Sequence, residues 1–194
     1  MTRRLSATDG DGLITAERDV RARLAITEPP LDVDFAATAV IANVFRIASA
    51  ARSVFERRVL GADRLSFTAF TVLWVLWIWG EQEFRHVAVE SSITKGTLTG
   101  VLSTLQGRGL VSRRRLDSDR RMVMVAATSD AEALMQRVFP AVNEQESEMV
   151  SRLDSSERDE LARLLREVLR QLDAEMASPG EPAMEEPAMD QRDG

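Results

Sequence analysis

Two short β-type runs stand in the middle of a chain whose apolar residues otherwise recur at helical spacing. They cover residues 110–114 and 122–127, and the polar turn Leu116-Asp117-Ser118-Asp119 separates them. Two short runs around an Asp/Ser turn predict a β-hairpin. A single hairpin in such a chain predicts a mainly α fold with a small β appendage.

Two short helices are predicted immediately before the hairpin, at residues 85–91 and 94–108. Thr94 can cap the second helix, because a threonine hydroxyl accepts a hydrogen bond from an N–H group of the first turn. Gly109 can end the same helix. Two short helices followed by a hairpin describe a winged helix-turn-helix, whose second helix enters the major groove of DNA. The hairpin would then be the wing.

Long amphipathic helices flank this unit. Apolar spacing predicts one helix from residue 34 to 60, ended by Gly61, and two more at 130–151 and 155–176. A further helix is predicted to begin at Ser66 or Thr68, either of which can cap it, and to run to Gly80. The last helix needs a partner surface. A monomer could fold it back on its own core, but the long, widely separated first and last helices favour a dimerisation region in a homodimer.

The expected organisation has three parts. The N-terminal extension covers residues 1–33 and is partly disordered, with a possible helix at 15–27. The main domain, 34–176, has dimerisation helices (34–60 and 130–176) around the winged helix-turn-helix (65–128), and an acidic disordered tail (177–194) follows.

Charge is unevenly distributed along the chain. The whole chain has a formal net charge of −6, yet residues 84–121 contain eight Arg or Lys and three Asp or Glu. That segment is therefore +5, which leaves −11 for the rest. An acidic protein repels a polyanion, whereas a basic lobe attracts one. Since the basic segment coincides with the predicted helices and hairpin, double-stranded DNA is the expected partner.

The candidate DNA contacts lie at the start of the second short helix and on the hairpin. Threonine hydroxyls and a lysine near a helix N-terminus can reach phosphates or base edges. Arginines on a wing suit the narrow minor groove, and a carboxylate there can hold a neighbouring guanidinium in position. The predicted contacts are Thr94, Lys95, Gly96, Thr97, Thr99, Arg113, Arg114, Arg115, Asp119, Arg120 and Arg121.

Composition excludes several other classes of function. The chain has no cysteine and one histidine, His86, so it offers no thiolate nucleophile, no disulfide framework and no multi-histidine metal site. No nucleophile–base pair can be assembled, which argues against an enzyme, and no cofactor is expected. The longest apolar run, Val72–Gly80, is too short to cross a bilayer, and no secretory signal is recognisable. A cytoplasmic protein without a membrane partner is predicted.

Several separated motifs resemble those of the MarR family of bacterial transcription regulators, in the same order and at the same spacing. They are Leu65-Ser66 with Phe70 and Leu73, Val87-Ala88, Ile93 through Thr99, Arg108-Gly109-Leu110-Val111 with Arg113-Arg114, and Asp119-Arg120-Arg121 with Val125 and Thr128. The resemblance covers about residues 35–175 and implies a homodimer that binds a pseudo-palindromic operator, commonly as a repressor. It also implies release from DNA by a small aromatic or phenolic acid.

The chain departs from the family pattern within the helix-turn-helix. Gly96 and Gly100 stand where longer polar residues are usual, and each costs the helix about 1 kcal/mol relative to alanine. Ser92 replaces the usual glycine of the turn. We therefore expect fewer side-chain contacts to bases from this helix than is usual in the family.

Four residues are candidates for an effector site. Trp74 and Trp77 share one helix face at i, i+3 spacing, where they either pack into the core or form the wall of a ligand pocket. Arg46 and His86 are candidate anchors for a carboxylate, or else surface and interface residues. The alternative for the whole chain is a winged-helix adaptor, whose arginines would serve an acidic protein partner instead of DNA.

Overall fold

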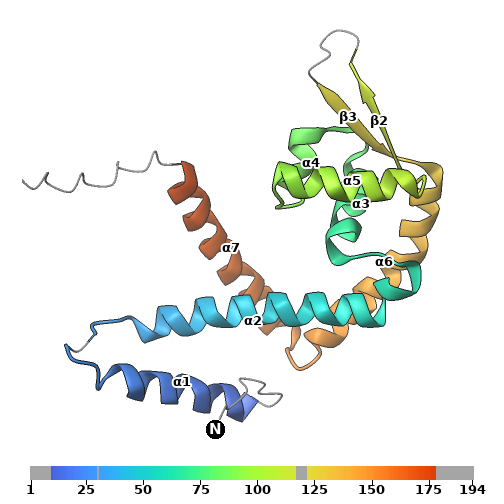
Figure 1. Cartoon of the computed structure of the whole chain (residues 1–194). Helices are drawn as coiled ribbons and strands as arrows, with labels where there is room; N and C mark the ends of the chain where they lie inside the picture. The colour runs from blue at the N-terminus through green and yellow to red at the C-terminus, as the bar shows by residue number, and fades with distance from the viewer. Residues whose placement is uncertain (1–9, 30, 117–121, 178–194) are drawn as a thin grey trace, which may run out of the picture. The chain divides into compact units, whose positions relative to one another are not determined.

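The computed structural model describes residues 10–29, 31–116 and 122–177, which form helices and one small sheet (Figure 1). Two compact units divide the chain, residues 1–145 and 146–194. The elements in chain order are α1 (Gly10–Leu24), α2 (Phe35–Arg58), the 3-10 helix η1 (Leu60–Asp63), α3 (Phe67–Trp79), β1 (Gln82–Glu83), α4 (Phe84–Glu90), α5 (Lys95–Gly107), β2 (Val111–Arg115), β3 (Val123–Ala127), α6 (Ser129–Met149) and α7 (Ser155–Ala177). The mainly α class with a small β wing is confirmed.

The hairpin forms as predicted, but it belongs to a three-stranded sheet. β2 and β3 are antiparallel, and β1 pairs with the other edge of β3, so the strand order is β1-β3-β2. β1 holds only two residues, too few to show the alternation by which a strand is recognised in sequence. The extra strand ties the segment before α4 to the base of the wing.

Local hydrogen bonds explain where several helices begin. The hydroxyls of Ser66 and Thr94 accept bonds from the N–H groups of Ala69 and Thr97, as predicted for N-caps of α3 and α5. Thr128 Oγ1 accepts from the N–H of Ala131 at the start of α6. α7 begins with a capping box, since the side chains of Asp154 and Glu157 each accept from the backbone N–H of the other residue. α1 begins at Gly10, earlier than the predicted residue 15.

The prediction that Gly61 ends the first long helix is wrong. α2 ends at Arg58, and Gly61 lies inside η1. Glycine is needed there for space, because a Cβ at this position would lie 2.8 Å from the carbonyl oxygen of Glu56. In this segment a positive φ occurs at Arg64 (51°), at the end of η1, and not at Gly61.

The hydrophobic core of the first unit joins the helix-turn-helix to the sheet and to α6. Its fully buried side chains include Leu73 and Leu76 of α3, Leu102 of α5, and Val125 of β3. α3 is buried over most of its length, which explains why its apolar residues show no single-face pattern. This core holds α5 and the wing in a fixed relation to each other.

α2 differs from α3, α5 and α6 because most of its apolar surface is exposed. Phe55 is its only buried residue. By length and composition alone, α2 is also the one helix among the described residues that could cross a membrane, with a mean hydropathy of 1.2 over its best window. It carries Arg46 and Arg52, however, and its Asn43 amide donates to the Glu17 carboxylate of α1 (3.1 Å). These polar groups favour packing against protein.

Ser92, in the turn between α4 and α5, has a φ of +52°. Only glycine adopts this region without steric cost, so Ser92→Gly is expected to raise the free energy of unfolding by about 0.5–1 kcal/mol. Chemical denaturation checks this gain. Ser92→Ala is the matched control, since alanine keeps the strained Cβ and should give no gain. An equal effect of both variants would contradict the proposed cause.

Candidate nucleic-acid interface

The N-terminal turn of α5 presents an exposed cation among threonines that serve the helix itself. Thr94 Oγ1 accepts from the backbone N–H of Thr97 at 3.1 Å and lies 2.9 Å from the Thr97 hydroxyl. Thr99 Oγ1 donates to the carbonyl oxygen of Lys95 at 2.9 Å. All four side chains are exposed, and Lys95 has no ion pair within the part of the chain that the structure describes. The lysine is therefore the group in this turn best placed to meet a phosphate.

Gly96 and Gly100 are two exposed positions of α5 that carry no side chain. Neither has a positive φ. A Cβ at Gly100 would meet nothing within 4 Å, and one at Gly96 would meet only Thr94 Oγ1, at 3.8 Å. Packing and backbone geometry therefore do not require glycine here. These positions give the helix a smooth surface that a second molecule can approach closely.

The three consecutive arginines of β2 have different environments. Arg113 lies on the same strand face as the buried Val111, and its Nε and Nη2 atoms are buried without a hydrogen-bond partner in the structure. Arg114 makes a bidentate ion pair with Glu81, at 2.8 Å from Nε and 2.5 Å from Nη2. Arg115 is exposed and has no ion pair with any described residue. Of the three, Arg115 is the most available to a phosphate.

The remaining predicted wing residues, Asp119, Arg120 and Arg121, lie outside the described residues.

The pair Arg114–Glu81 is expected to stabilise the fold in a pH-dependent way. The hydrogen bond from Arg114 holds the pKa of Glu81 below its ordinary value of 4.5. A lowered pKa means that the stabilisation is present above 4.5 and is lost as the pH falls through the lowered value. Because both side chains are partly exposed, a double-mutant cycle of Arg114→Ala and Glu81→Gln should give a coupling of at most about 1 kcal/mol at pH 7. A coupling that persists in strong acid would contradict this assignment.

Arg108, which counts toward the basic segment, makes hydrogen bonds within the fold. Its guanidinium donates to the backbone oxygens of Arg64 (3.0 Å) and Asp63 (2.8 Å), and Arg137 pairs with the Asp63 carboxylate. These contacts join the end of α5 and α6 to η1. No local pattern could reveal them, because Arg108 and Arg64 are 44 residues apart.

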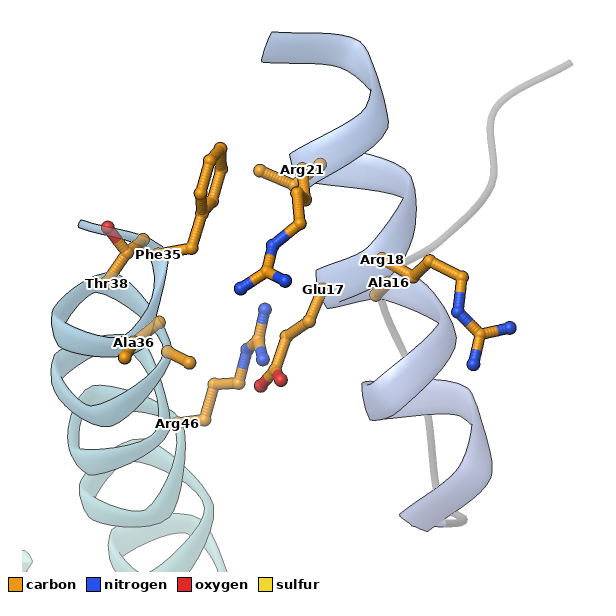
Figure 2. Close-up of a pocket in the computed structure, with 11 residues that line it drawn as sticks. Ala16, Glu17, Arg18, Arg21, Phe35, Ala36, Thr38 and Arg46 are labelled. Carbon is orange, nitrogen blue, oxygen red and sulfur yellow. The ribbon is translucent and has the colours of Figure 1, made fainter. Parts of the chain in front are cut away.

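The four candidate effector residues have different surroundings in the structure. Trp74 and Trp77 are half-buried against the core, and the Trp77 ring lies 5.6 Å from that of Phe139. His86 is exposed on α4. Arg46 instead lines a pocket between α1 and α2, and none of the other three residues contributes to that pocket (Figure 2). Sequence reasoning did not find this pocket, because nothing local shows that α1 packs beside α2.

Comparisons with known proteins decide the family. The model of the MarR family matches residues 65–123. The HTH-type transcriptional regulator YwaE of Bacillus subtilis (strain 168) is 32% identical over 141 residues, which cover 72% of this chain and 82% of the relative. The chain belongs to the MarR family. It is therefore a DNA-binding transcriptional regulator with a winged helix-turn-helix, and not an enzyme.

Further comparisons give another sequence relative and two solved structures with a similar fold. The transcriptional repressor YetL of Bacillus subtilis (strain 168) is 24% identical over 143 residues, 73% of this chain and 85% of the relative. BpsR of Bordetella bronchiseptica, whose DNA binding is regulated by 6-hydroxynicotinic acid, superimposes with a TM-score of 0.62 at 26% identity, covering 66% of this chain and 97% of its own. NadR, solved with 4-hydroxyphenylacetate, gives a TM-score of 0.60 at 24% identity over 70% of this chain and 98% of its own.

Proposed function

We propose that this MarR-family chain is a ligand-responsive repressor that binds a pseudo-palindromic operator as a homodimer. The observation that carries the proposal is the pair of exposed cations, Lys95 on α5 and Arg115 on β2, which have no ion pair with the described residues. In a winged helix-turn-helix the corresponding elements meet the major groove and the flanking backbone. Lys95 and Arg115 would neutralise phosphates, while the first turn of α5 would face base edges.

A homodimer would cover apolar surface that a single copy exposes on α2 and α7. Phe45 of α2 is 71% exposed, and α7 has leucines along one side and charged residues along the other. The exposed apolar residues of the two helices are Val40, Ile41, Phe45, Ile47, Leu161, Leu164, Leu165, Leu169, Leu172 and Met176. Monomeric soluble proteins rarely expose apolar surface of this extent. A dimer with two recognition helices about 34 Å apart would read two half-sites on one face of the DNA.

The effector we propose is a small aromatic or phenolic acid, as in the regulation of BpsR by 6-hydroxynicotinic acid. Such an acid would release the repressor by binding more tightly to a dimer whose recognition helices are wrongly spaced for the operator. Arg46, Trp74, Trp77 and His86 remain the candidate ligand residues. A DNA-bound regulator acts in the cytoplasm, which is the location we propose.

Footprinting of genomic DNA with the purified full chain tests this function. We expect protection of a pseudo-palindromic site near the chain's own coding region, with affinity that falls steeply between low and moderate salt because phosphate contacts release counterions. Random duplex of equal length is the control. Equal affinity for both duplexes would overturn sequence-specific regulation and favour the adaptor instead.

A further inference from the structure

A pocket of about 330 Å³ lies between α1 and α2, and no residue of the helix-turn-helix lines it. Pockets of this size accommodate small organic molecules. Its apolar lining comes from Val20 of α1 and from Phe35 and several alanines of α2, and its polar lining includes Glu17, Arg21 and Arg46. Figure 2 shows the guanidinium groups of Arg21 and Arg46 directed toward each other in the space between the two helices.

The charges in this pocket are not balanced. Arg21 lies over the Phe35 ring, 5.0 Å from its centroid, and Arg46 donates to the amide oxygen of Asn43, at 3.3 Å. Neither guanidinium has an ion pair within the described part of the chain. The Glu17 carboxylate accepts from Asn43 Nδ2 instead. Two facing guanidinium groups repel each other, and an anion between them would turn that repulsion into attraction.

We infer that this pocket binds a small carboxylate with an apolar body. Guanidinium groups hold carboxylates through paired N–H···O bonds, and two of them can share one carboxylate. The Phe35 ring and the alanine-lined side of α2 would receive the apolar body. The inference places the effector of the proposed function between α1 and α2. It rests on the proposed function only for the link between ligand binding and DNA binding.

Calorimetric titration of the full chain in the absence of DNA tests the site. The probes are benzoate, 4-hydroxyphenylacetate and 6-hydroxynicotinate, each compared at millimolar concentration with its uncharged amide. We expect at least one carboxylate to bind and its amide to bind at least about tenfold more weakly, because a charge-assisted pair is lost. No binding by any of the carboxylates, or equal binding by acids and amides, would overturn the inference.

Arginine variants locate the binding site. Arg21→Gln and Arg46→Gln are each expected to weaken binding at least about tenfold. Arg23→Gln is the matched control, because Arg23 is exposed on the same helix as Arg21 but does not line the pocket. We expect this control variant to bind the carboxylate as tightly as the parent chain does. Equal losses in all three variants would show a general charge effect and overturn the site.

Glu17→Gln gives a test that does not depend on removing an arginine. The glutamine keeps an oxygen that can accept from Asn43, so only the negative charge is lost. A carboxylate ligand should then bind more tightly, by about threefold or more, because its repulsion by Glu17 disappears. Weaker or unchanged binding would overturn the inference. Since no DNA is present, the outcome is separate from whether the chain represses an operator.

Discussion

Arg115→Ala and Lys95→Ala are each expected to weaken binding of the operator duplex about tenfold, a loss of about 1.4 kcal/mol. Both side chains are exposed, and neither is neutralised by a carboxylate among the described residues. Each is therefore available to a phosphate. The loss should be similar for operator and random duplex, and each variant should lower the slope of log affinity against log salt by about 1. Fluorescence anisotropy over a salt series measures both quantities.

Arg114→Ala is the matched control on the same strand. Glu81 already neutralises Arg114 through a bidentate pair, so this substitution should change DNA affinity by less than about threefold. Circular dichroism verifies that all three variants fold. Wild-type affinity and an unchanged salt slope in both Arg115→Ala and Lys95→Ala would contradict the proposed interface. A larger loss from Arg114→Ala than from Arg115→Ala would show that the Glu81 pair does not decide which arginine meets DNA.

Leu172→Glu is expected to dissociate the proposed homodimer and, with it, to weaken operator binding by about a hundredfold or more. Leu172 is 45% exposed on the apolar side of α7. A carboxylate buried at an apolar interface without a partner costs several kcal/mol, whereas the same carboxylate on a monomer stays in water. A monomer reads one half-site and loses the gain in affinity that comes from engaging both. Analytical ultracentrifugation and anisotropy measure the two effects.

Ala174→Glu introduces the same side chain two residues later, at an exposed position on the opposite side of α7, because an α-helix has about 3.6 residues per turn. It should leave both the dimer and the operator affinity unchanged. Phe45→Glu on α2 should repeat the effect of Leu172→Glu if both helices form the interface. A Leu172→Glu chain that still sediments as a dimer would exclude the apolar side of α7 from that interface.

The sequence by itself was sufficient for features that depend on neighbours within one turn. Ser66 and Thr94 cap the helices that follow them, because an N-cap needs only an N–H group three residues ahead. The hairpin was predictable from its two runs and the turn between them. The separated motifs also indicated the MarR family, which the comparison with YwaE establishes.

Only the tertiary structure decided which charged side chains are buried, paired or exposed. Sequence treated the β2 arginines as equivalent, yet Arg113 is turned inward, Arg114 is held by Glu81 and Arg115 is exposed. Strand alternation accounts for part of this difference, but the partner of Arg114 lies 33 residues away along the chain.

The same limit applies to Arg46 and to Arg108. Sequence grouped Arg46 with Trp74, Trp77 and His86, whereas the fold brings it to α1. By sequence Arg108 belongs to a basic segment, whereas in the fold its guanidinium donates hydrogen bonds to backbone oxygens at the end of η1. Helix caps and turns are made by groups close in the chain, so the order of residues specifies them. Ion pairs and pockets join groups that are distant in the chain, and only packing brings these together.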